Sequence, residues 1–385
     1  MRKIRVNLFE MLLMIIFFSL IAFRLLRKRK EIKVEKILIF EYSKEYTEKI
    51  NEIASKHQKL MKFAGLLSLI SAPILTFVGV YYLINSLIYS KMSVALVLPT
   101  VSEFKYPGPV ISVPFWIWIV AIFLIIFSHE SMHALIASTE GVKTRRYGII
   151  YLLIVPIGAF VDLSEKKLEK LEPKKKIKIF AAGSFGNLIL FLVFTILLFL
   201  IIQLTNITFE SKGVWFNNTI PESPAEKVGL KGIITQINNK TINNIYDLQD
   251  FLKNTKPYST VTIKTTEGIF NITLAEKDNA SYIGIMDVRN YIVYKNTNTP
   301  ANENLLKLFA YLILVVQWVS FLSLGIAVAN MLPIIPLDGG LITKEILKNI
   351  FGKKGELASK FISALFIVVV VYSLLSPSLT PRAVS

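Results

Sequence analysis

Two histidines and a glutamate stand inside a strongly apolar stretch, FLIIFSHESMHALIAS, which covers residues 123–138. Ionisable groups are costly within a bilayer unless something compensates, so such a cluster indicates a functional site. The segment HESMH has the pattern H-E-x-x-H. On a helix, His129 and His133 project from one face, where both imidazoles can hold one Zn²⁺. Glu130 is one residue further round, placed to accept a proton from a water activated by the metal.

A catalytic zinc site needs a third protein ligand. The chain has three histidines, and the remaining one, His57, lies in the basic segment EIASKHQKLMK, which indicates a surface residue. A carboxylate at membrane depth is therefore expected as the third ligand, and Asp338 in NMLPIIPLDGG is the candidate. Pro and Gly break the backbone of this segment, and such a backbone is tolerated at membrane depth only when it is buried in protein or lines a watery cavity. The alternatives are ordinary turn chemistry for this segment and polar packing inside a helix bundle for HESMH.

The composition is that of a membrane protein. Of the 385 residues, 53% are hydrophobic, and the mean hydropathy is +0.53. The formal net charge is +17, but the basic residues flank apolar runs, which favours a membrane topology signal and argues against nucleic-acid binding. The chain has no cysteine, which excludes thiolate ligands and a cysteine nucleophile.

About six apolar runs are long enough, or nearly so, to cross a bilayer. They cover residues 8–26, 63–89, 110–138, 177–204, 305–332 and 358–375. Residues 147–163 form a shorter run that is interrupted by Gly and Pro and rich in strand-forming residues. We expect a polytopic α-helical membrane protein with about six transmembrane helices and a membrane-associated β-hairpin at this shorter run, with a seventh span as the alternative.

Basic residues predict the orientation. Residues 27–62, 143–178 and 344–360 are expected as strongly basic cytoplasmic loops at a plasma membrane, with the active site toward the cytoplasmic side. The predicted divisions are two N-terminal spans with a basic loop (1–109), the first part of the membrane core (110–204), an extracytoplasmic domain (205–303) and the second part of the core (304–385).

The 205–303 segment has the pattern of a soluble α+β domain. GVWF, IITQINN and VTIKTTEGIFNITLA predict strands, and TIPESPAEKVGL predicts a turn followed by a short helix that ends at Gly229. NIYDLQDFLKN predicts an amphipathic helix with Tyr246, Leu248, Phe251 and Leu252 on its apolar face.

The motifs resemble those of the site-2 proteases, which are intramembrane zinc metalloproteases, over most of the chain from about Ile111 onward. Members carry H-E-x-x-H on one transmembrane helix and Asn-x-x-Pro…Leu-Asp-Gly on a later one. The matching residues are His129, Glu130, His133, Asn330, Pro333, Leu337, Asp338 and Gly339. The resemblance implies that Asp338 is the third Zn²⁺ ligand and Glu130 the general base.

AAGSFGN resembles the small-residue stretch of this family that ends in asparagine, although Ser184 stands where a proline is common. Asn187 is then a candidate donor to the tetrahedral oxyanion. The alternative for Gly183, Gly186 and Asn187 is close helix packing with an interhelical hydrogen bond. The expected substrate-binding residues are Gly148, Ile149 and Phe160 of the hairpin, together with Asn330 and Pro333.

Residues 205–303 resemble a PDZ domain of the permuted bacterial and archaeal type, through ESPAEKVGL, ITQINNKTI and YDLQDFLKN in that order. The turn after GLKG is shorter than usual. The resemblance implies a groove lined by the VWF strand and the helix around Leu248, which could receive a peptide C-terminus or a regulatory partner.

These features predict an intramembrane zinc metalloprotease that cleaves transmembrane protein substrates in regulated intramembrane proteolysis. The expected surroundings are the lipid bilayer, and no binding to nucleic acid is expected. The strand edge of the hairpin would hold an unwound substrate segment. One alternative is a catalytically inactive membrane scaffold that acts through the PDZ-like domain, which the intact HESMH disfavours. The other is a transporter with a metal site at broken helices, which the lack of a two-fold hydropathy repeat disfavours.

Overall fold

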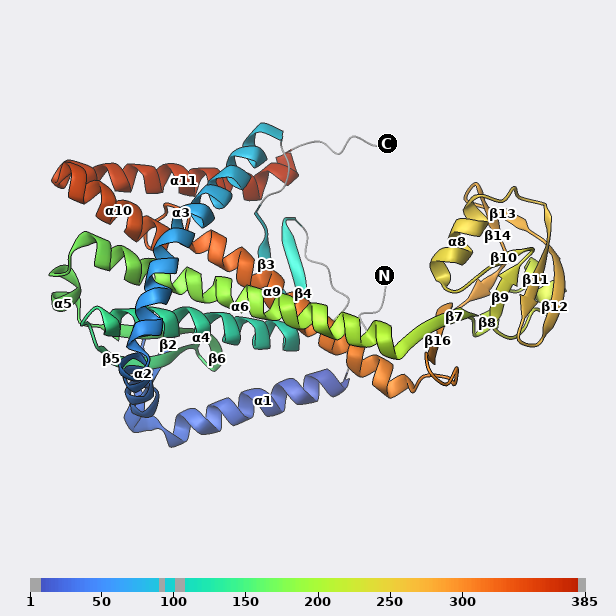
Figure 1. Ribbon diagram of the computed structural model, residues 1–385, viewed down its shortest axis with the longest axis horizontal. Coiled ribbons are helices and arrows are strands. Elements are labelled where there is room, and N and C mark those ends of the chain that lie inside the picture. Colours follow the sequence, from blue (N-terminus) through green and yellow to red (C-terminus); the bar gives the residue numbers. More distant parts are fainter. Residues whose placement is uncertain (1–7, 90–93, 101–107, 380–385) are drawn as a thin grey trace. The chain divides into compact units, whose positions relative to one another are not determined.

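The computed structural model describes residues 8–89, 94–100 and 108–379. It divides into two compact units, of which the second covers Leu198–Ile313 and the first covers the rest of the chain. Figure 1 shows the elements of both units in chain order. The first unit contains most of the helices, a four-stranded sheet and a two-stranded sheet, whereas the second is mainly built of strands.

Five of the described helices are long and apolar enough to cross a membrane, so the chain is a polytopic helical membrane protein. They are α3 (Gln58–Tyr89), α4 (Phe115–Thr139), α6 (Pro173–Thr208), α9 (Glu303–Asn330) and α11 (Lys353–Leu379). The first apolar run also forms a helix, α1 (Leu8–Arg27), which is not among those five.

The start of the third predicted span is a strand and not a helix. Val110–Pro114 forms β4, which pairs in parallel with β3 (Leu96–Thr100). Helix α4 begins directly after Pro114, where the fixed φ of proline suits a helix entry and the missing N–H costs nothing. Part of the predicted excursion at 90–108 lies outside the described residues.

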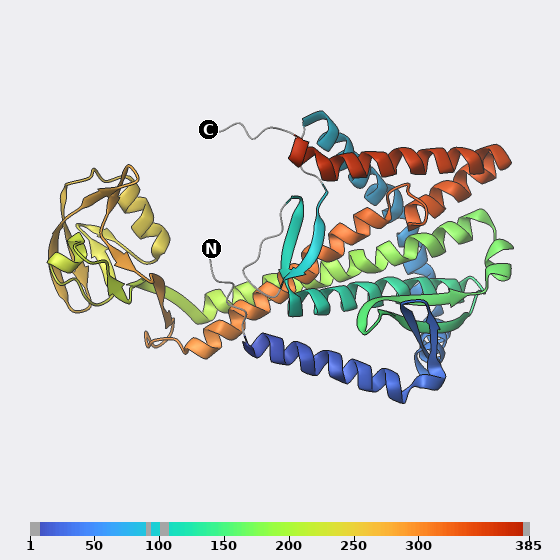
Figure 2. The same cartoon turned by 180° about the vertical axis from the view of Figure 1, so that it is seen from behind.

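One four-stranded antiparallel sheet belongs to the first unit. Its strands, in pairing order, are β1 (Ile32–Glu35), β2 (Leu38–Ser43), β5 (Thr144–Leu152) and β6 (Val155–Leu163). The predicted hairpin is confirmed, and a seventh span is excluded because the segment pairs as two strands. Figure 2 shows the sheet between α1 and α4.

All three segments that we expected to be basic loops are folded. Residues 27–62 contain a short 3₁₀ turn (Arg29–Glu31), β1, β2 and helix α2 (Lys44–Lys56), because their alternating apolar residues pair with the hairpin. The 143–178 segment contains the hairpin and α5 (Glu165–Glu169). The 344–360 segment is helical, since α10 (Asp338–Phe351) is followed after Gly352 by α11, and Gly352 at φ 59° reverses the chain.

Small residues let the membrane helices approach closely, as is usual in membrane bundles. Buried alanines lie at 121, 134, 137, 181, 182 and 327. Hydroxyl groups add interhelical hydrogen bonds: Thr195 and Ser320 are 2.8 Å apart, and the Thr76 hydroxyl donates to the carbonyl of Met331 over 3.0 Å.

The second unit is built on a five-strand path in the order β12-β11-β9-β7-β16. Its strands are β7 (Phe209–Trp215), β8 (Asn218–Thr219), β9 (Ile234–Ile237), β10 (Lys240–Thr241), β11 (Thr260–Thr265), β12 (Gly268–Thr273), β13 (Ala275–Lys277), β14 (Ala280–Tyr282), β15 (Ile285–Met286) and β16 (Arg289–Tyr294). Two helices, α7 (Pro224–Lys227) and α8 (Ile245–Lys253), accompany them. A buried aliphatic core that includes Ile234, Ile237 and Ile263 holds this unit together.

Most predicted elements of the second unit are present, with one correction. Leu248 of α8 is buried and Phe251 and Leu252 pack on the core, but Tyr246 is 83% exposed, because it lies on the opposite side of the helix from Leu248. Val214 of the VWF strand pairs with β9 on one side and β16 on the other, so the backbone has no free edge at this residue. The groove that this strand was expected to line stays a prediction.

Candidate active site

The two histidines of HESMH lie on α4, which contains neither Gly nor Pro and is therefore a continuous helix through the motif. His129 and His133 are one turn apart on the same face, and their Nε2 atoms are 3.1 Å from each other. The Nε2 atoms of both imidazoles point toward the carboxylate of Asp338, at 3.3 Å and 3.4 Å. The structure thus brings together the three residues that the sequence predicted as ligands.

Asp338 reaches this position because the chain turns sharply between α9 and α10. Helix α9 ends at Asn330, and Asp338 is the first residue of α10. The turn folds back over the two glycines that follow: a Cβ at Gly339 would lie 2.2 Å from the Met331 carbonyl oxygen, and one at Gly340 would lie 2.3 Å from the Ile334 carbonyl carbon. Only glycine permits this approach, so LDGG is required to place the carboxylate.

The three side chains have the spacing of a tetrahedral metal site. Zinc–nitrogen and zinc–oxygen bonds of about 2.0–2.2 Å at tetrahedral angles put ligand atoms about 3.3 Å apart. The two Nε2 atoms are 3.1 Å apart, and they lie 3.3 and 3.4 Å from the two different oxygens of the Asp338 carboxylate. Within the described part of the chain, Asp338 Oδ2 is buried without a hydrogen-bond partner, and a buried oxygen of this kind is expected to have a partner. The residues therefore fit a four-coordinate metal ion with one position open.

Helix α6 packs against the face of α4 that carries the histidines. Gly183 lies directly opposite them, since a Cβ there would be 2.3 Å from His133 Nε2 and 2.5 Å from His129 Cε1. His133 Nδ1 is 2.7 Å from the carbonyl oxygen of Ile179, and His129 Nδ1 is 3.3 Å from the amide nitrogen of Asn187. The predicted close packing at this stretch is present, and Asn187 contacts a ligand.

Glu130 faces a different neighbour from the two ligands. It is one residue past His129, which turns it about 100° round the helix. Its carboxylate lies beside the backbone N–H of Val161 in β6. Glu130 continues a stripe of α4 that includes Ile119, Phe123 and Ile126, at spacings of three and four residues. Glu130 therefore lies between the three candidate ligands and the hairpin.

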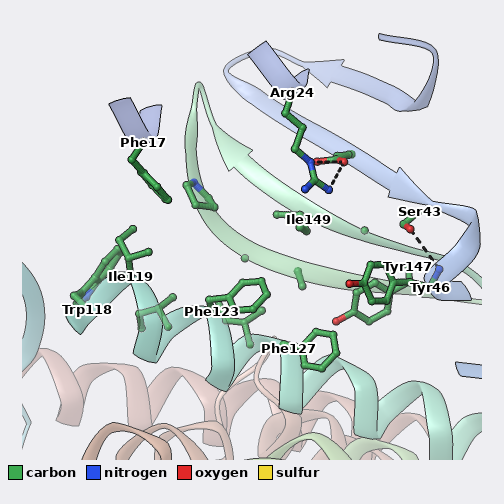
Figure 3. A pocket seen from close by; sticks show the side chains of 17 residues that line it. Phe17, Arg24, Ser43, Tyr46, Trp118, Ile119, Phe123, Phe127, Tyr147 and Ile149 are labelled. Carbon is green, nitrogen blue, oxygen red and sulfur yellow. Dashed lines mark hydrogen bonds and ion pairs between the residues drawn. The ribbon is translucent and has the colours of Figure 1, made fainter. Parts of the chain in front are cut away.

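That stripe of α4 lines an apolar pocket of about 280 Å³ between α1, α4 and the sheet. Phe123 and Phe127 of α4 point toward the strands, where Tyr147 and Ile149 face them (Figure 3). The strands contribute small residues, among them Gly158 and Ala159. The pocket is thus a largely apolar chamber whose nearest α4 residue, Phe127, lies about one helical turn before Glu130.

An ion pair between the half-exposed Arg24 and the buried Glu41 lines one side of this pocket and was not predicted from the sequence. Arg24 of α1 donates to Glu41 Oε1 over 2.9 and 3.1 Å, and the Tyr151 hydroxyl donates to Glu41 Oε2 over 2.7 Å. Burial alone would raise the pKa of Glu41, but these hydrogen bonds outweigh it, so the pKa is lowered. Arg24 and Glu41 are far apart in sequence, and neither belongs to a motif, so no local pattern could have paired them.

The predicted substrate-binding residues lie in two places. Gly148 and Ile149 line the pocket, but β5 carries them between β2 and β6, so their backbone offers no free edge. Phe160 lies on β6, and its ring packs on Phe40 and Tyr42 outside the pocket lining.

Three further predicted positions lie away from the pocket. Asn330 ends α9, and Pro333 is buried in the turn that carries Asp338; neither lines the pocket. His57 follows α2, is exposed and does not belong to the metal-ligand group, which confirms it as a surface residue.

A metal-ligand trio with an adjacent glutamate, inside a bundle of membrane-spanning helices, is the site of a membrane-embedded metallopeptidase. The chain belongs to peptidase family M50, the site-2 protease family: the family described as "Peptidase family M50" matches residues 117–374, which include every predicted ligand. The chain is also similar to "Uncharacterized protein MJ0971" of Methanocaldococcus jannaschii, with 30% identity over 321 residues and 77% of each chain covered. The predicted family is confirmed, whereas the PDZ-like character of residues 205–303 stays a prediction.

Proposed function

We propose that the protein is an intramembrane zinc metalloprotease that hydrolyses peptide bonds within or near the transmembrane segments of membrane-anchored proteins. The observation that carries this proposal is the position of Glu130, which directly follows one of the three candidate ligands and lies beside Val161 of the hairpin. A metal used only for structure would have four protein ligands and no acid–base residue beside it. Regulated intramembrane proteolysis is the process that such an activity would serve.

His129, His133 and Asp338 would hold the ion, and a bound Zn²⁺ supplies Lewis acidity and makes water a stronger acid at neutral pH. Glu130 would take the proton from the attacking water and return it to the leaving amine, which is the usual task of a positioned carboxylate. The apolar surroundings strengthen these electrostatic interactions.

The substrate would bind in an extended form along β6. A transmembrane helix already satisfies its own backbone hydrogen bonds, so its scissile carbonyl becomes accessible only after unwinding. Among the described strands none pairs with the outer edge of β6, and the Val161 N–H on that edge lies beside Glu130. An unwound segment that added to this edge would have its backbone hydrogen bonds satisfied, and the pocket would accept a large apolar side chain.

The second unit would act as a PDZ-like module that binds a peptide C-terminus or a regulatory partner. Because β7 is paired with β16 along its length and with β9 at Val214, a bound peptide would need a strand edge other than the paired backbone at Val214. We place this module outside the cytoplasm and the active site toward the cytoplasmic side of the plasma membrane, following the basic segments.

Zinc content and cleavage test this function together. The purified protein should contain about one zinc per chain, lost in Asp338→Ala and kept in the control His57→Ala. It would be reconstituted with synthetic single-span peptides flanked by lysines, and products would be mapped by mass spectrometry. Glu130→Gln should keep the zinc and lower kcat by about 10²–10⁴-fold. A zinc-loaded protein that cleaves no peptide, or a Glu130→Gln variant that cleaves as well as wild type, would overturn the proposal.

A further inference from the structure

Both metal-binding imidazoles make their second contact with the same helix. Ile179, Gly183 and Asn187 follow one another at intervals of four residues on α6 and are buried, so they share the face that packs on α4. Gly183 leaves room for the two rings. The carbonyl of Ile179 and the side chain of Asn187 lie at the Nδ1 atoms of His133 and His129.

For His133, this contact determines the tautomer. A backbone carbonyl can only accept, so the 2.7 Å contact with Ile179 requires a proton on Nδ1. The Nε2 atom of His133 then carries the free lone pair that a metal needs, and it is the atom that faces Asp338 Oδ1 at 3.4 Å. Outer contacts of this kind orient metal-binding histidines and raise their basicity.

His129 must likewise keep a free lone pair on Nε2 to bind a metal, and this atom faces Asp338 Oδ2 at 3.3 Å. When this Nε2 binds a metal, Nδ1 carries the proton and must donate. The ring also interacts with the backbone of Gly183, and the side-chain atom opposite Nδ1, 3.3 Å away, is assigned as the amide nitrogen of Asn187, which is also a donor. Meanwhile the amide oxygen of Asn187 is buried without a hydrogen-bond partner among the residues that the structure describes.

Rotating the amide by 180° removes both the donor–donor contact and the unpaired oxygen, and the two ends of an asparagine amide are assigned from their hydrogen bonds. We propose that Asn187 is a positioning residue: its amide oxygen accepts the Nδ1–H of His129 and so holds this imidazole in the tautomer that binds the metal. This inference rests on the metal site of the proposed function. It differs from the role of oxyanion donor, in which the amide would have to donate to the reacting carbonyl.

The two roles make opposite demands on the substituent at position 187. Asn187→Asp keeps an acceptor oxygen of the same size and loses the donor, whereas Asn187→Leu keeps the approximate volume and loses both. If the oxygen positions His129, Asn187→Leu should lower zinc affinity by about 10–100-fold, which is the usual effect of removing an outer-sphere partner. Asn187→Asp should hold zinc within about threefold of wild type or more tightly, because a carboxylate is the stronger acceptor.

The measurement is chelator competition for zinc on the purified full-length chain at pH 7, with thermal unfolding in the same detergent. Ser184→Ala is the matched control, because Ser184 is also fully buried on α6 and its hydroxyl makes no hydrogen bond among the described residues. It should leave zinc affinity unchanged. Weak zinc binding by Asn187→Leu, with rescue by Asn187→Asp, is the expected result.

Three outcomes count against the assignment. Wild-type zinc affinity in Asn187→Leu would overturn it while leaving the proposed function intact. Equal loss in both Asn187 variants would show that acceptance by the oxygen is not what holds the metal. A wild-type protein without zinc would instead contradict the metal site itself, so failure of this inference and failure of the proposed function are distinguishable.

Discussion

Replacing Gly183 by alanine should expel the metal while the protein stays folded. A Cβ at this position would lie 2.3 Å from His133 Nε2, whereas ordinary van der Waals contact begins at 3.4 Å, so the imidazole would have to retreat by about 1.1 Å. His129 would be displaced as well, because its Cε1 and Nε2 would lie 2.5 and 2.6 Å from the same carbon. The substitution therefore acts on two ligands at once.

The expected loss of zinc affinity follows from the small ligand displacement that a metal site tolerates. Ligand distances in zinc sites hold to within about 0.2 Å, so a displacement of about 1.1 Å removes a ligand. Loss of an outer contact alone costs about 10–100-fold in affinity, and displacing a ligand should therefore cost at least about 100-fold. Backbone propensity acts in the opposite direction, because alanine stabilises a helix interior by about 0.5–1 kcal/mol relative to glycine.

The assay is zinc per chain by elemental analysis, with chelator competition and thermal unfolding in detergent. Gly325→Ala on α9 is the matched control, since a Cβ there has no heavy atom within 4 Å and should change only helix propensity. Gly183→Ala should lose zinc without a lower midpoint for the metal-free protein. If Gly183→Ala binds zinc as tightly as Gly325→Ala does, α6 is not held against the two imidazoles, and the reasoning is refuted.

Two further predictions concern the pocket and the ion pair beside it. A Cβ at Gly158 would meet no atom closer than 3.9 Å, so the Gly158→Leu variant should fold and keep its zinc. Its larger side chain should fill the pocket and lower kcat/KM for peptides with large apolar residues by at least about tenfold. Unchanged cleavage of the reconstituted peptides would contradict the pocket's role. Protonating Glu41 should release α1 from the sheet. The pKa of Glu41 is lowered in the folded protein, so its ionised carboxylate stabilises the fold at pH values above the ordinary pKa of about 4.3. This stabilisation is lost as the pH falls through the pKa of the folded state. Faster hydrogen exchange in α1 at low pH, absent from the pH dependence of Glu41→Gln, is the expected signature.

The cluster of His129, His133 and Asp338 could be predicted from the sequence because its parts are encoded locally. H-E-x-x-H places two imidazoles on one helix face whatever the tertiary structure, and LDGG combines a carboxylate with glycines that a close turn needs. The spans could be predicted because length and hydropathy are sufficient for that assignment. The hairpin followed from β-branched residues interrupted by Pro and Gly. In each case a short window of sequence carries the whole physical reason.

The wall of the pocket could not be predicted, since it depends on partners that are distant in sequence. Residues 32–43 contain Lys and Glu and look like part of a solvated basic loop, yet they pair with the hairpin and bury Glu41 to 2% exposure. That burial is tolerated only because Arg24 and Tyr151 supply hydrogen bonds from another helix and another strand. The prediction that Tyr246 lies on the apolar face of its helix was wrong for a related reason, because an aromatic residue on a helix does not show which side the core will cover.

Helix α4 divides the site into two sides. His129 and His133 face α6 and Asp338, whereas Glu130 faces the hairpin and the pocket, and the difference of about 100° follows from a shift of one residue in the motif. A substrate that approached from the α6 side would meet the packed face around Gly183. Under the proposed function, approach from the sheet would instead reach Glu130 first, with the three candidate ligands behind it. Substitutions on α6 should therefore alter metal binding and spare substrate selection, and substitutions on the hairpin should do the reverse.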